Sequence, residues 1–290
     1  MTTAAFLLVF TSAFCHATWN FLLKRSDHKT AFLFSLGVVS FTVFLVPAIV
    51  ATSIEGIGAR GLMFGVVTAL LHGVYGLSLS RSYELGDLST VYPISRGMGP
   101  ALIPLAAVIF LGERASLVAG FGIALVVLGV YAINIEAGSV RNLLQPLRSL
   151  NRPATRIALL TGALIATYSL WDKAALDDLS PLTLNQFAMA GHALVLAPIA
   201  LRHGGRAVRH EWRERRGSIL AAGVLAPMAY VLVLVALTSS RISYVAPVRE
   251  VGIVIGAMLG VMLLGEGYGR WRIAGAVTIL AGVLTLALAP

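Results

Sequence analysis

Residues 89–113, STVYPISRGMGPALIPLAAVIFLGE, have a related stretch in the second half of the chain, SYVAPVREVGIVIGAMLGVMLLGE, at residues 243–266. Both stretches begin with a serine, have a proline four residues later, and close on Leu-Gly-Glu after a long apolar run. The two align with one residue of slippage between Pro93/Pro247 and the closing Gly112-Glu113/Gly265-Glu266. Two such copies predict that the chain is built from an internal repeat.

Other positions recur at nearly the same spacing. The coincident residues are Gly122 with Gly275, Gly129-Val130 with Gly282-Val283, and Trp19-Asn20 with Trp171-Asp172. We therefore predict a first repeat over residues 1–140, a connecting loop over 141–153 and a second repeat over 154–290. The recurrence of Glu113 and Glu266 indicates turns that define the fold more than it indicates catalysis.

The solvent around most of this chain is predicted to be lipid. Of its 290 residues, 58% are hydrophobic and 12% are charged, whereas a soluble domain carries roughly 25% charged residues. A membrane-spanning helix needs about 20 mainly apolar residues. Ten runs meet or approach that length: 3–23, 30–51, 61–81, 90–111, 117–135, 155–171, 180–201, 217–239, 243–264 and 272–289. The first run lacks a basic leader and recurs later in the chain, so it is expected to belong to the fold and not to a signal peptide.

Ten spans in two copies give five spans per copy. Because five is odd, the second copy must enter the bilayer from the opposite side. The predicted fold class is an all-α integral membrane protein with ten transmembrane helices in two inverted five-helix repeats. Many secondary transporters have this architecture, with the substrate site near the bilayer midplane between the repeats.

The formal net charge of +9 would suggest nucleic acid as a partner of a soluble protein. Here the basic residues lie in short gaps between apolar runs, where they fix topology and meet anionic lipid headgroups. We expect membrane lipids as partners and no nucleic acid. Most of these residues lie in odd-numbered connections, above all in residues 202–216, so the positive-inside rule places those connections in the cytoplasm and both termini outside.

The motifs resemble the EamA-type branch of the drug/metabolite transporter superfamily. The resemblance rests on Val91 to Gly97 through Gly112-Glu113-Arg114, on Val245-Ala246-Pro247 through Gly265-Glu266, and on His16 to Asn20. It implies proton- or exchange-driven transport through a cavity lined by the first, third, fourth, sixth, eighth and ninth helices. It also implies a multi-pass protein of the cell membrane, the inner membrane in a bacterium. Members of the family usually have cytoplasmic termini, whereas the charge distribution places both termini outside. Both orientations therefore stay open.

Ionisable residues inside predicted spans are the first site candidates, because a charge at the centre of a membrane helix is costly and is usually functional. Arg96 follows Pro93, and Arg249 and Glu250 follow Pro247. Alignment on the prolines sets Arg96 opposite Glu250, which makes an ion pair between the repeats plausible. The alternative is a structural pair that joins two helices. The arginines favour a solute with a carboxylate or another anionic group, such as an amino acid.

Two matching helix faces supply further candidates. His16, Trp19 and Asn20 lie on one face of the first run, and Tyr168, Trp171 and Asp172 lie at the corresponding positions of the sixth. Aromatic walls with a few hydrogen-bonding groups suit small amphipathic solutes. The tryptophans are equally consistent with an aromatic belt at the membrane surface.

His72 and Tyr75 share a face of the third run, Tyr92 precedes Pro93, and Tyr230 lies near Pro227. Either His16 or His72 is a candidate carrier of a coupling proton, because histidine titrates near physiological pH. A buried histidine bonded to a neighbouring carbonyl group is the alternative.

The sequence thus predicts a secondary transporter, with an exporter favoured, of small metabolites such as amino acids or related anionic or zwitterionic solutes. An intramembrane enzyme acting on a lipid or small solute is the alternative, although no catalytic motif is present. We expect no catalytic residue, no cofactor and no metal. Cys15 is the only cysteine, so multi-cysteine sites within one chain are excluded. The expected assembly is a monomer or a homodimer.

Overall fold

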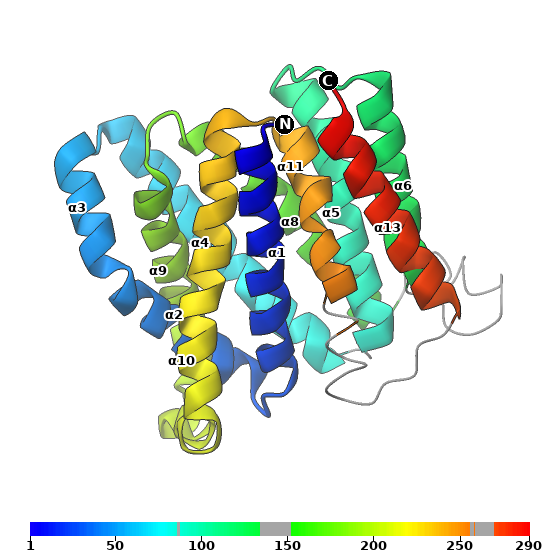
Figure 1. Cartoon of the computed structure of the whole chain (residues 1–290). Helices are drawn as coiled ribbons and strands as arrows, with labels where there is room; N and C mark the ends of the chain where they lie inside the picture. The colour runs from blue at the N-terminus through cyan, green and yellow to red at the C-terminus, as the bar shows by residue number, and fades with distance from the viewer. Residues whose placement is uncertain (86–87, 134–151, 256–257, 259–269) are drawn as a thin grey trace.

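The computed structural model describes residues 1–85, 88–133, 152–255, 258 and 270–290, and this part of the chain is helical without any strand. The helices form a bundle in which both chain termini lie at one end (Figure 1). Their bounds are α1 Thr3–Lys24, α2 Lys29–Val43, α3 Leu45–Glu55, α4 Ala59–Leu85, α5 Leu88–Phe110, α6 Leu117–Ile133, α8 Pro153–Ala175, α9 Pro181–Ala200, α10 Arg202–Ser239, α11 Ile242–Arg249 and α13 Arg270–Leu288.

Helix starts follow local sequence signals. The Thr2 hydroxyl caps α1 by accepting a hydrogen bond from the Ala5 amide at 3.2 Å, and the Ser180 hydroxyl caps α9 by accepting from the Thr183 amide. Proline occupies the first turn of α8 and α9, where its missing N–H has no intrahelical partner to lose. The apolar runs found in the sequence therefore become helices with sharply defined beginnings.

Two predicted spans are broken. The run 30–51 forms α2 and α3, which meet at Phe44 with a bend of 52°. The run beginning at 243 forms α11, which ends at Arg249, and the Glu250 amide bonds the Pro247 carbonyl three residues back. Such a tight turn interrupts the regular α-helical ladder. Both predicted runs are therefore helical but interrupted, and their hydrophobicity alone does not reveal the breaks.

By length and composition, four helices in the described part of the chain suffice to cross a membrane, namely α1, α4, α9 and α10. The bent pair α2–α3 passes the same test when its two parts are taken together. Shorter apolar helical segments cover Met98–Phe110, Leu117–Ala132 and Ile273–Leu288. The chain is therefore an all-helical protein with four to five candidate spans on this criterion.

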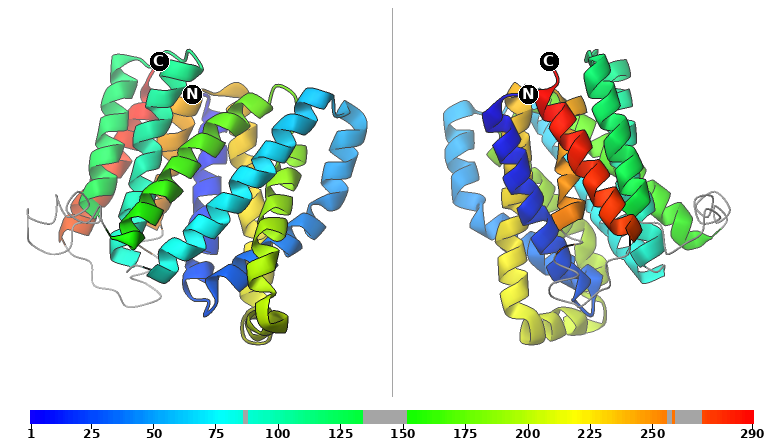
Figure 2. Two further views of the ribbon diagram at one scale, coloured as in Figure 1. Left: turned by 180° about the vertical axis from the view of Figure 1, so that it is seen from behind. Right: turned by 45° about the vertical axis from the view of Figure 1, so that its right-hand side comes forward.

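Helix packing is reciprocal between the two halves of the chain. Helix α1 packs against α10 and α8 packs against α4, while α2 contacts α10 and α9 contacts α4. The other major contacts join α6 to α13, α5 to α8, α2 to α9 and α5 to α11. Figure 2 shows α6 and α13 side by side at one edge of the bundle and α3 at the opposite edge. Exchanging the corresponding helices of the two halves reproduces these pairings, with the contact of α5 and α8 having a less extensive counterpart in α1 and α11.

Helices α4 and α9 approach each other closely. A Cβ atom added to Gly191 would overlap the Ala69 carbonyl oxygen, and one added to Gly73 would meet the Gly191 carbonyl oxygen at 2.7 Å. Small residues are what allow two backbones to come this close in a membrane bundle. The third helix of the first half is thereby held directly against the second helix of the other half.

The Gly112-Glu113 turn also joins the two halves. Gly112 has φ 65°, a conformation that glycine adopts without a steric penalty. The Glu113 carboxylate then accepts hydrogen bonds from the Ile242 amide at 2.9 Å, and from the Ser243 amide at 3.0 Å and hydroxyl at 2.6 Å. It satisfies the free N–H groups at the start of α11. Glu113 is thus a helix cap, in agreement with the fold-defining role predicted for it; Glu266 lies outside the described residues.

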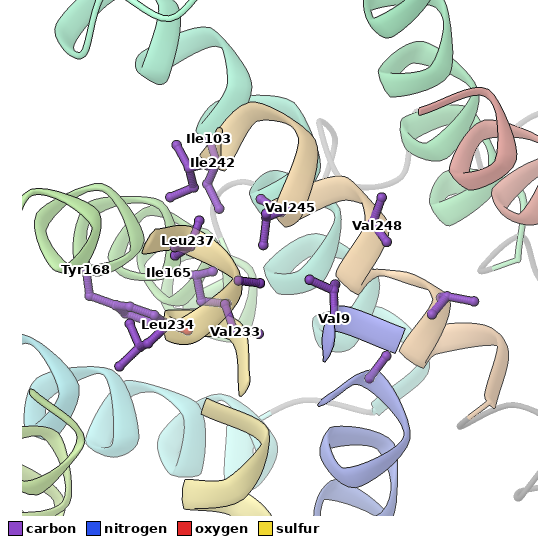
Figure 3. Close-up of a cluster of buried hydrophobic side chains, with 14 of the residues drawn as sticks. Val9, Ile103, Ile165, Tyr168, Val233, Leu234, Leu237, Ile242, Val245 and Val248 are labelled. Atoms are coloured by element: carbon purple, nitrogen blue, oxygen red, sulfur yellow. The ribbon is translucent and has the colours of Figure 1, made fainter. Parts of the chain in front are cut away.

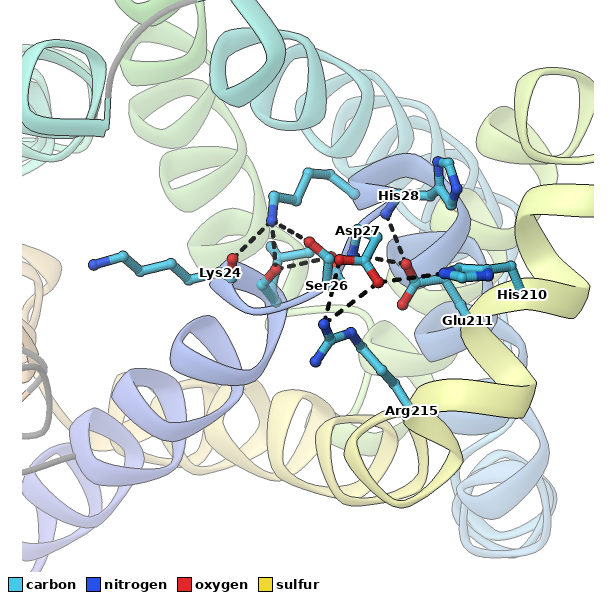
Figure 4. Close-up of polar contacts among 9 residues, drawn as sticks. Lys24, Ser26, Asp27, His28, His210, Glu211 and Arg215 are labelled. Atoms are coloured by element: carbon cyan, nitrogen blue, oxygen red, sulfur yellow. Dashed lines mark hydrogen bonds and ion pairs between the residues drawn. The ribbon is translucent and has the colours of Figure 1, made fainter. Parts of the chain in front are cut away.

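Residues 202–216, which the sequence analysis treated as a connection, form the first part of α10 at the end of the bundle opposite the termini (Figure 1). The Glu211 carboxylate is fully buried and accepts hydrogen bonds from the amides of Asp27 and His28 at 2.8 and 2.7 Å (Figure 4). It caps the start of α2. This contact and the bond from Trp212 Nε1 to the Ser35 hydroxyl attach the segment to the bundle. The backbone of α10 departs from helical geometry at His203, Gly204, Gly205 and Arg215, so α10 is kinked and not one straight helix.

Asp27 extends this contact. Its carboxylate accepts hydrogen bonds from Arg215 Nη2 at 3.3 and 3.4 Å and contacts His210 Nε2 at 3.3 Å. The bonds from Arg215 and then His210 hold the pKa of the Asp27 carboxyl below its ordinary value. The turn between α1 and α2 is therefore fixed to α10 by both a buried cap and an exposed ionic contact.

Candidate functional site

A buried carboxylate lies at the contact of three helices. Asp172 of α8 is 1% exposed. Its Oδ1 accepts a hydrogen bond from the Thr68 hydroxyl at 2.8 Å, and its Oδ2 accepts one from the Tyr230 hydroxyl at 2.6 Å. Oδ2 also lies 2.8 Å from His72 Nε2. Three side chains from α4 and α10 thus surround one acidic group.

Helical spacing produces this arrangement. Thr68 and His72 are one turn apart on α4, so both face the same side of the helix. Both are buried, with 0% and 4% exposure. An ionisable group inside a membrane bundle is expensive unless it is paired, and the default interpretation of such a group is functional. At Asp172, three hydrogen-bonding partners offset the cost of burying the carboxylate.

Aromatic rings enclose His72. Its ring centre lies 4.3 Å from that of Tyr168 and 5.0 Å from that of Tyr230. Tyr75 is buried one turn further along α4 and contacts Tyr168 edge-on at 5.2 Å. The site therefore combines an acid, an imidazole and phenolic rings within one small volume.

A narrow cavity opens beside Asp172. Tyr168, Ser169, Asp172, Tyr230 and Arg249 supply its polar lining. Its apolar wall consists of Val233, Leu234, Leu237, Ile242, Val245 and Ala246, most of which are labelled in Figure 3. The space available to the centres of water molecules is about 20 Å³, enough for a water molecule but not for a metabolite. In this conformation the helices are closed around the site.

The broken end of α11 carries the opposite charge into this cavity. Arg249 lines it, and its Nε is buried without a hydrogen-bond partner among the described residues. The next residue, Glu250, is 3% exposed and occupies the break itself. Asp172 and Arg249 thus place an acidic and a basic side chain on one lining.

Comparison with known proteins identifies the family. The model of the EamA-like transporter family matches residues 3–135 and again residues 154–288. The chain belongs to the EamA-like transporter family. It is also 35% identical over 81 residues to the nicotine metabolites export pump subunit NepA of Paenarthrobacter nicotinovorans, an alignment that covers 28% of this chain and 70% of that protein. A crystal structure of another protein superposes with a TM-score of 0.73 over 99% of both chains at 17% identity, which shows a shared fold.

In this EamA-like transporter, the candidates on α1 contact one another. Trp19 Nε1 donates to His16 Nδ1 at 3.2 Å, and Asn20 Nδ2 donates to the His16 carbonyl oxygen at 2.9 Å. The described cavity lining contains none of these three residues. Trp171 donates through Nε1 to the Phe64 carbonyl oxygen at 3.1 Å, which attaches α8 to α4.

The side chains of two predicted candidates, Tyr92 and Arg96, lie outside the described residues. The ion pair predicted between Arg96 and Glu250 therefore also lies outside them. The remaining candidates separate into the α1 residues, which contact one another, and a second group around Asp172. His72, Tyr75, Tyr168, Asp172 and Tyr230 lie together in one connected cluster, and Arg249 faces the same cavity.

The sequence analysis missed two members of this transporter's polar cluster. Thr68 was overlooked because a threonine in an apolar run carries no charge signal. His192 of α9 is 7% exposed, and its ring centre lies 6.0 Å from that of His72. The sequence signal for His192 is a histidine inside the apolar run 180–201, the same signal that His72 gives in the run 61–81. The described residues bring no three His, Cys, Asp or Glu side chains together as metal ligands.

Proposed function

We propose that this chain is a secondary transporter that exports small zwitterionic metabolites, of the amino-acid type, by alternating access. The observation that carries the proposal is the cavity shared by the Asp172 carboxylate and the Arg249 guanidinium. A solute with an ammonium group and a carboxylate complements both side chains. Sequence reasoning from the arginines alone favoured an anionic group; the buried Asp172 supports adding a cationic one.

The surroundings of the two charges suit such a solute. Aromatic and aliphatic walls with a few polar groups are typical of small-molecule sites, and the cavity has Tyr168, Tyr230 and a run of aliphatic side chains. A low-dielectric setting strengthens each ionic contact. Arg249 Nε has no described partner, so a solute carboxylate would satisfy a buried donor.

Alternating access needs two related halves that move against each other. The proposal therefore includes ten membrane spans in two inverted five-helix repeats, over residues 1–140 and 154–290. The two separate family matches and the reciprocal helix packing support it. The position of both termini at one end of the bundle agrees with an even number of spans (Figure 1).

The closed cavity requires a conformational change before a metabolite can enter. Helices interrupted near a site supply hinge points and free backbone groups in many transporters. The break at Glu250 is an interruption of this kind, because the preceding residue, Arg249, lines the cavity. We propose that rearrangement at Glu250 opens the cavity, because that residue directly follows Arg249.

His72 and Asp172 are the proposed carriers of a coupling proton. An imidazole at 2.8 Å from a carboxylate forms a pair that can hold or release one proton as the cavity changes access. The export direction is proposed from the similarity to NepA, a subunit of an export pump. The cell membrane is the proposed location, with lipids as the surrounding partners and a monomer or homodimer as the assembly.

A ligand screen followed by flux measurements tests the proposal. Amino acids and related metabolites are screened for thermal stabilisation of the detergent-purified protein, and each hit is then followed into proteoliposomes. We expect the intact solute to accumulate across the membrane, and Asp172→Asn to abolish its flux. Asp177→Asn, the same change on an exposed side chain nearby, serves as the control and should transport normally.

The alternative function, an intramembrane enzyme, predicts a different result in the same vesicles. The solute would be recovered chemically changed, and its conversion would not require a sealed membrane. Recovery of unmodified solute inside sealed vesicles, lost when the membrane is made leaky, excludes that alternative.

A further inference from the structure

A second cavity lies far from the transport site, where α9 meets the first part of α10. It is wide-mouthed, has a volume of about 520 Å³, and lies beside the turn between α1 and α2. Its polar lining consists of His28, Arg202, His203, Arg206 and His210. The rings of His28 and His210 lie edge to face at 5.4 Å (Figure 4). Binding pockets for small ligands have volumes in this range.

Every ionisable side chain in the described lining is basic. The two nearby carboxylates, Glu211 and Asp27, are not part of this lining and have hydrogen-bond partners outside it. Glu211 accepts the amide hydrogens at the start of α2, and Asp27 is bonded to Arg215 as well as to His210. No described acidic side chain therefore enters the cavity to neutralise Arg202 and Arg206.

The backbone that forms one wall is unusual. His203, Gly204 and Gly205 have φ values of 53°, 71° and 69°, which is three consecutive residues in the left-handed region. His203 is the only non-glycine residue with positive φ in the described part of the chain. A strained backbone of this kind persists where surrounding structure holds it and is common at ligand sites. Here it turns the chain between Arg202 and Arg206 so that both line one cavity.

We propose that this cavity binds a phosphate group, with the headgroup of an anionic phospholipid as its source. Guanidinium groups bind phosphate oxygens through paired hydrogen bonds. Ile199, Ala200 and Ala207 complete the lining with apolar surface, which suits the glycerol and first acyl carbons of a lipid better than a free ion. Basic pockets between helices at a membrane surface bind anionic headgroups by this combination.

The site has a structural consequence for the transporter. It adjoins the contact through which Glu211 and Asp27 fix the α1–α2 turn to α10. A headgroup bound between α9 and α10 would hold the first part of α10 in place at the end of the bundle. The proposal does not depend on which solute is transported.

Binding is tested on the full-length protein in detergent with four soluble probes: short-chain phosphatidylglycerol, short-chain phosphatidylcholine, glycerol phosphate and inorganic phosphate. The thermal shift and the bound mass in native mass spectrometry are measured. The test variant is Arg202→Gln/Arg206→Gln. The matched control is Arg213→Gln/Arg216→Gln, which makes the same charge change on exposed arginines of the same segment outside the cavity.

We expect phosphatidylglycerol to bind and stabilise the native protein more than phosphatidylcholine. Loss of both cavity arginines should weaken that binding by roughly tenfold or more, while the control retains most of it. Equal binding of glycerol phosphate or inorganic phosphate would keep the phosphate site but overturn the lipid as its source. Equal loss in both double variants, or no preference for phosphatidylglycerol, would overturn the site, because either result reflects general surface charge alone.

Discussion

Replacement of Tyr230 by phenylalanine removes one hydroxyl group and leaves the aromatic ring in place. In the native protein that hydroxyl donates to Asp172 Oδ2 at 2.6 Å. A hydrogen bond to a charged group contributes about 1.5–3 kcal/mol, whereas a bond between neutral groups contributes about 0.5–1.5 kcal/mol. We expect Tyr230→Phe to lower the free energy of unfolding by about 1.5–3 kcal/mol, because Asp172 retains only Thr68 and His72 as partners.

Ser40 offers a control hydroxyl with a neutral acceptor. It is buried and donates to the Gly223 carbonyl oxygen at 2.8 Å, so Ser40→Ala should cost about 0.5–1.5 kcal/mol. Both variants are unfolded by titration with a denaturing detergent and followed by tryptophan fluorescence. In an Asp172→Asn background, the cost of Tyr230→Phe should shrink toward that of the control. An equal cost of Tyr230→Phe in both backgrounds would refute the idea that the Asp172 side chain organises this cluster.

Three further predictions concern the packing and the contacts at the ends of the helices. Glu211→Ala leaves two amides at the start of α2 without their acceptor and should lower unfolding stability by about 2–4 kcal/mol, whereas Glu211→Gln, which keeps an acceptor oxygen, should lose less. Gly191→Ala should destabilise by about 1–3 kcal/mol or more through overlap with the Ala69 carbonyl oxygen, whereas Gly217→Ala, with no atom nearby, should be tolerated. Because the pKa of Asp27 is lowered in the folded protein, its contact stabilises the fold above the carboxyl's ordinary pKa, and this stabilisation is lost as the pH falls through the lower folded value. Asp27→Asn should therefore make the melting temperature depend less on pH in the acid range. An unchanged pH profile of the melting temperature would contradict this.

The helix positions were predictable because lipid demands long apolar runs. The runs 3–23, 61–81 and 117–135 correspond closely to α1, α4 and α6. The breaks at Phe44 and Glu250 do not follow from hydrophobicity alone. Pro47 and Pro247, each three residues from a break, were the sequence signal for them.

The site was predictable only in part. Asp172 and Tyr230 were found because a charge or a phenol stands out in an apolar run, and Asp172 also matches Asn20 in the repeat. Their bonding to Thr68 and His72 depends on how α4, α8 and α10 pack, which a single sequence does not specify. The role of Glu211 was hidden for the same reason, since its partners lie at the start of α2.

The central claim is that Asp172 and Arg249 recognise the two charges of a zwitterionic solute. The most direct test compares proteoliposome flux of the identified solute with flux of its analogue lacking the carboxylate, in the native protein and in Arg249→Gln. The account predicts that the native protein strongly prefers the zwitterion and that Arg249→Gln transports both forms at similarly low rates. An undiminished preference in Arg249→Gln would contradict it.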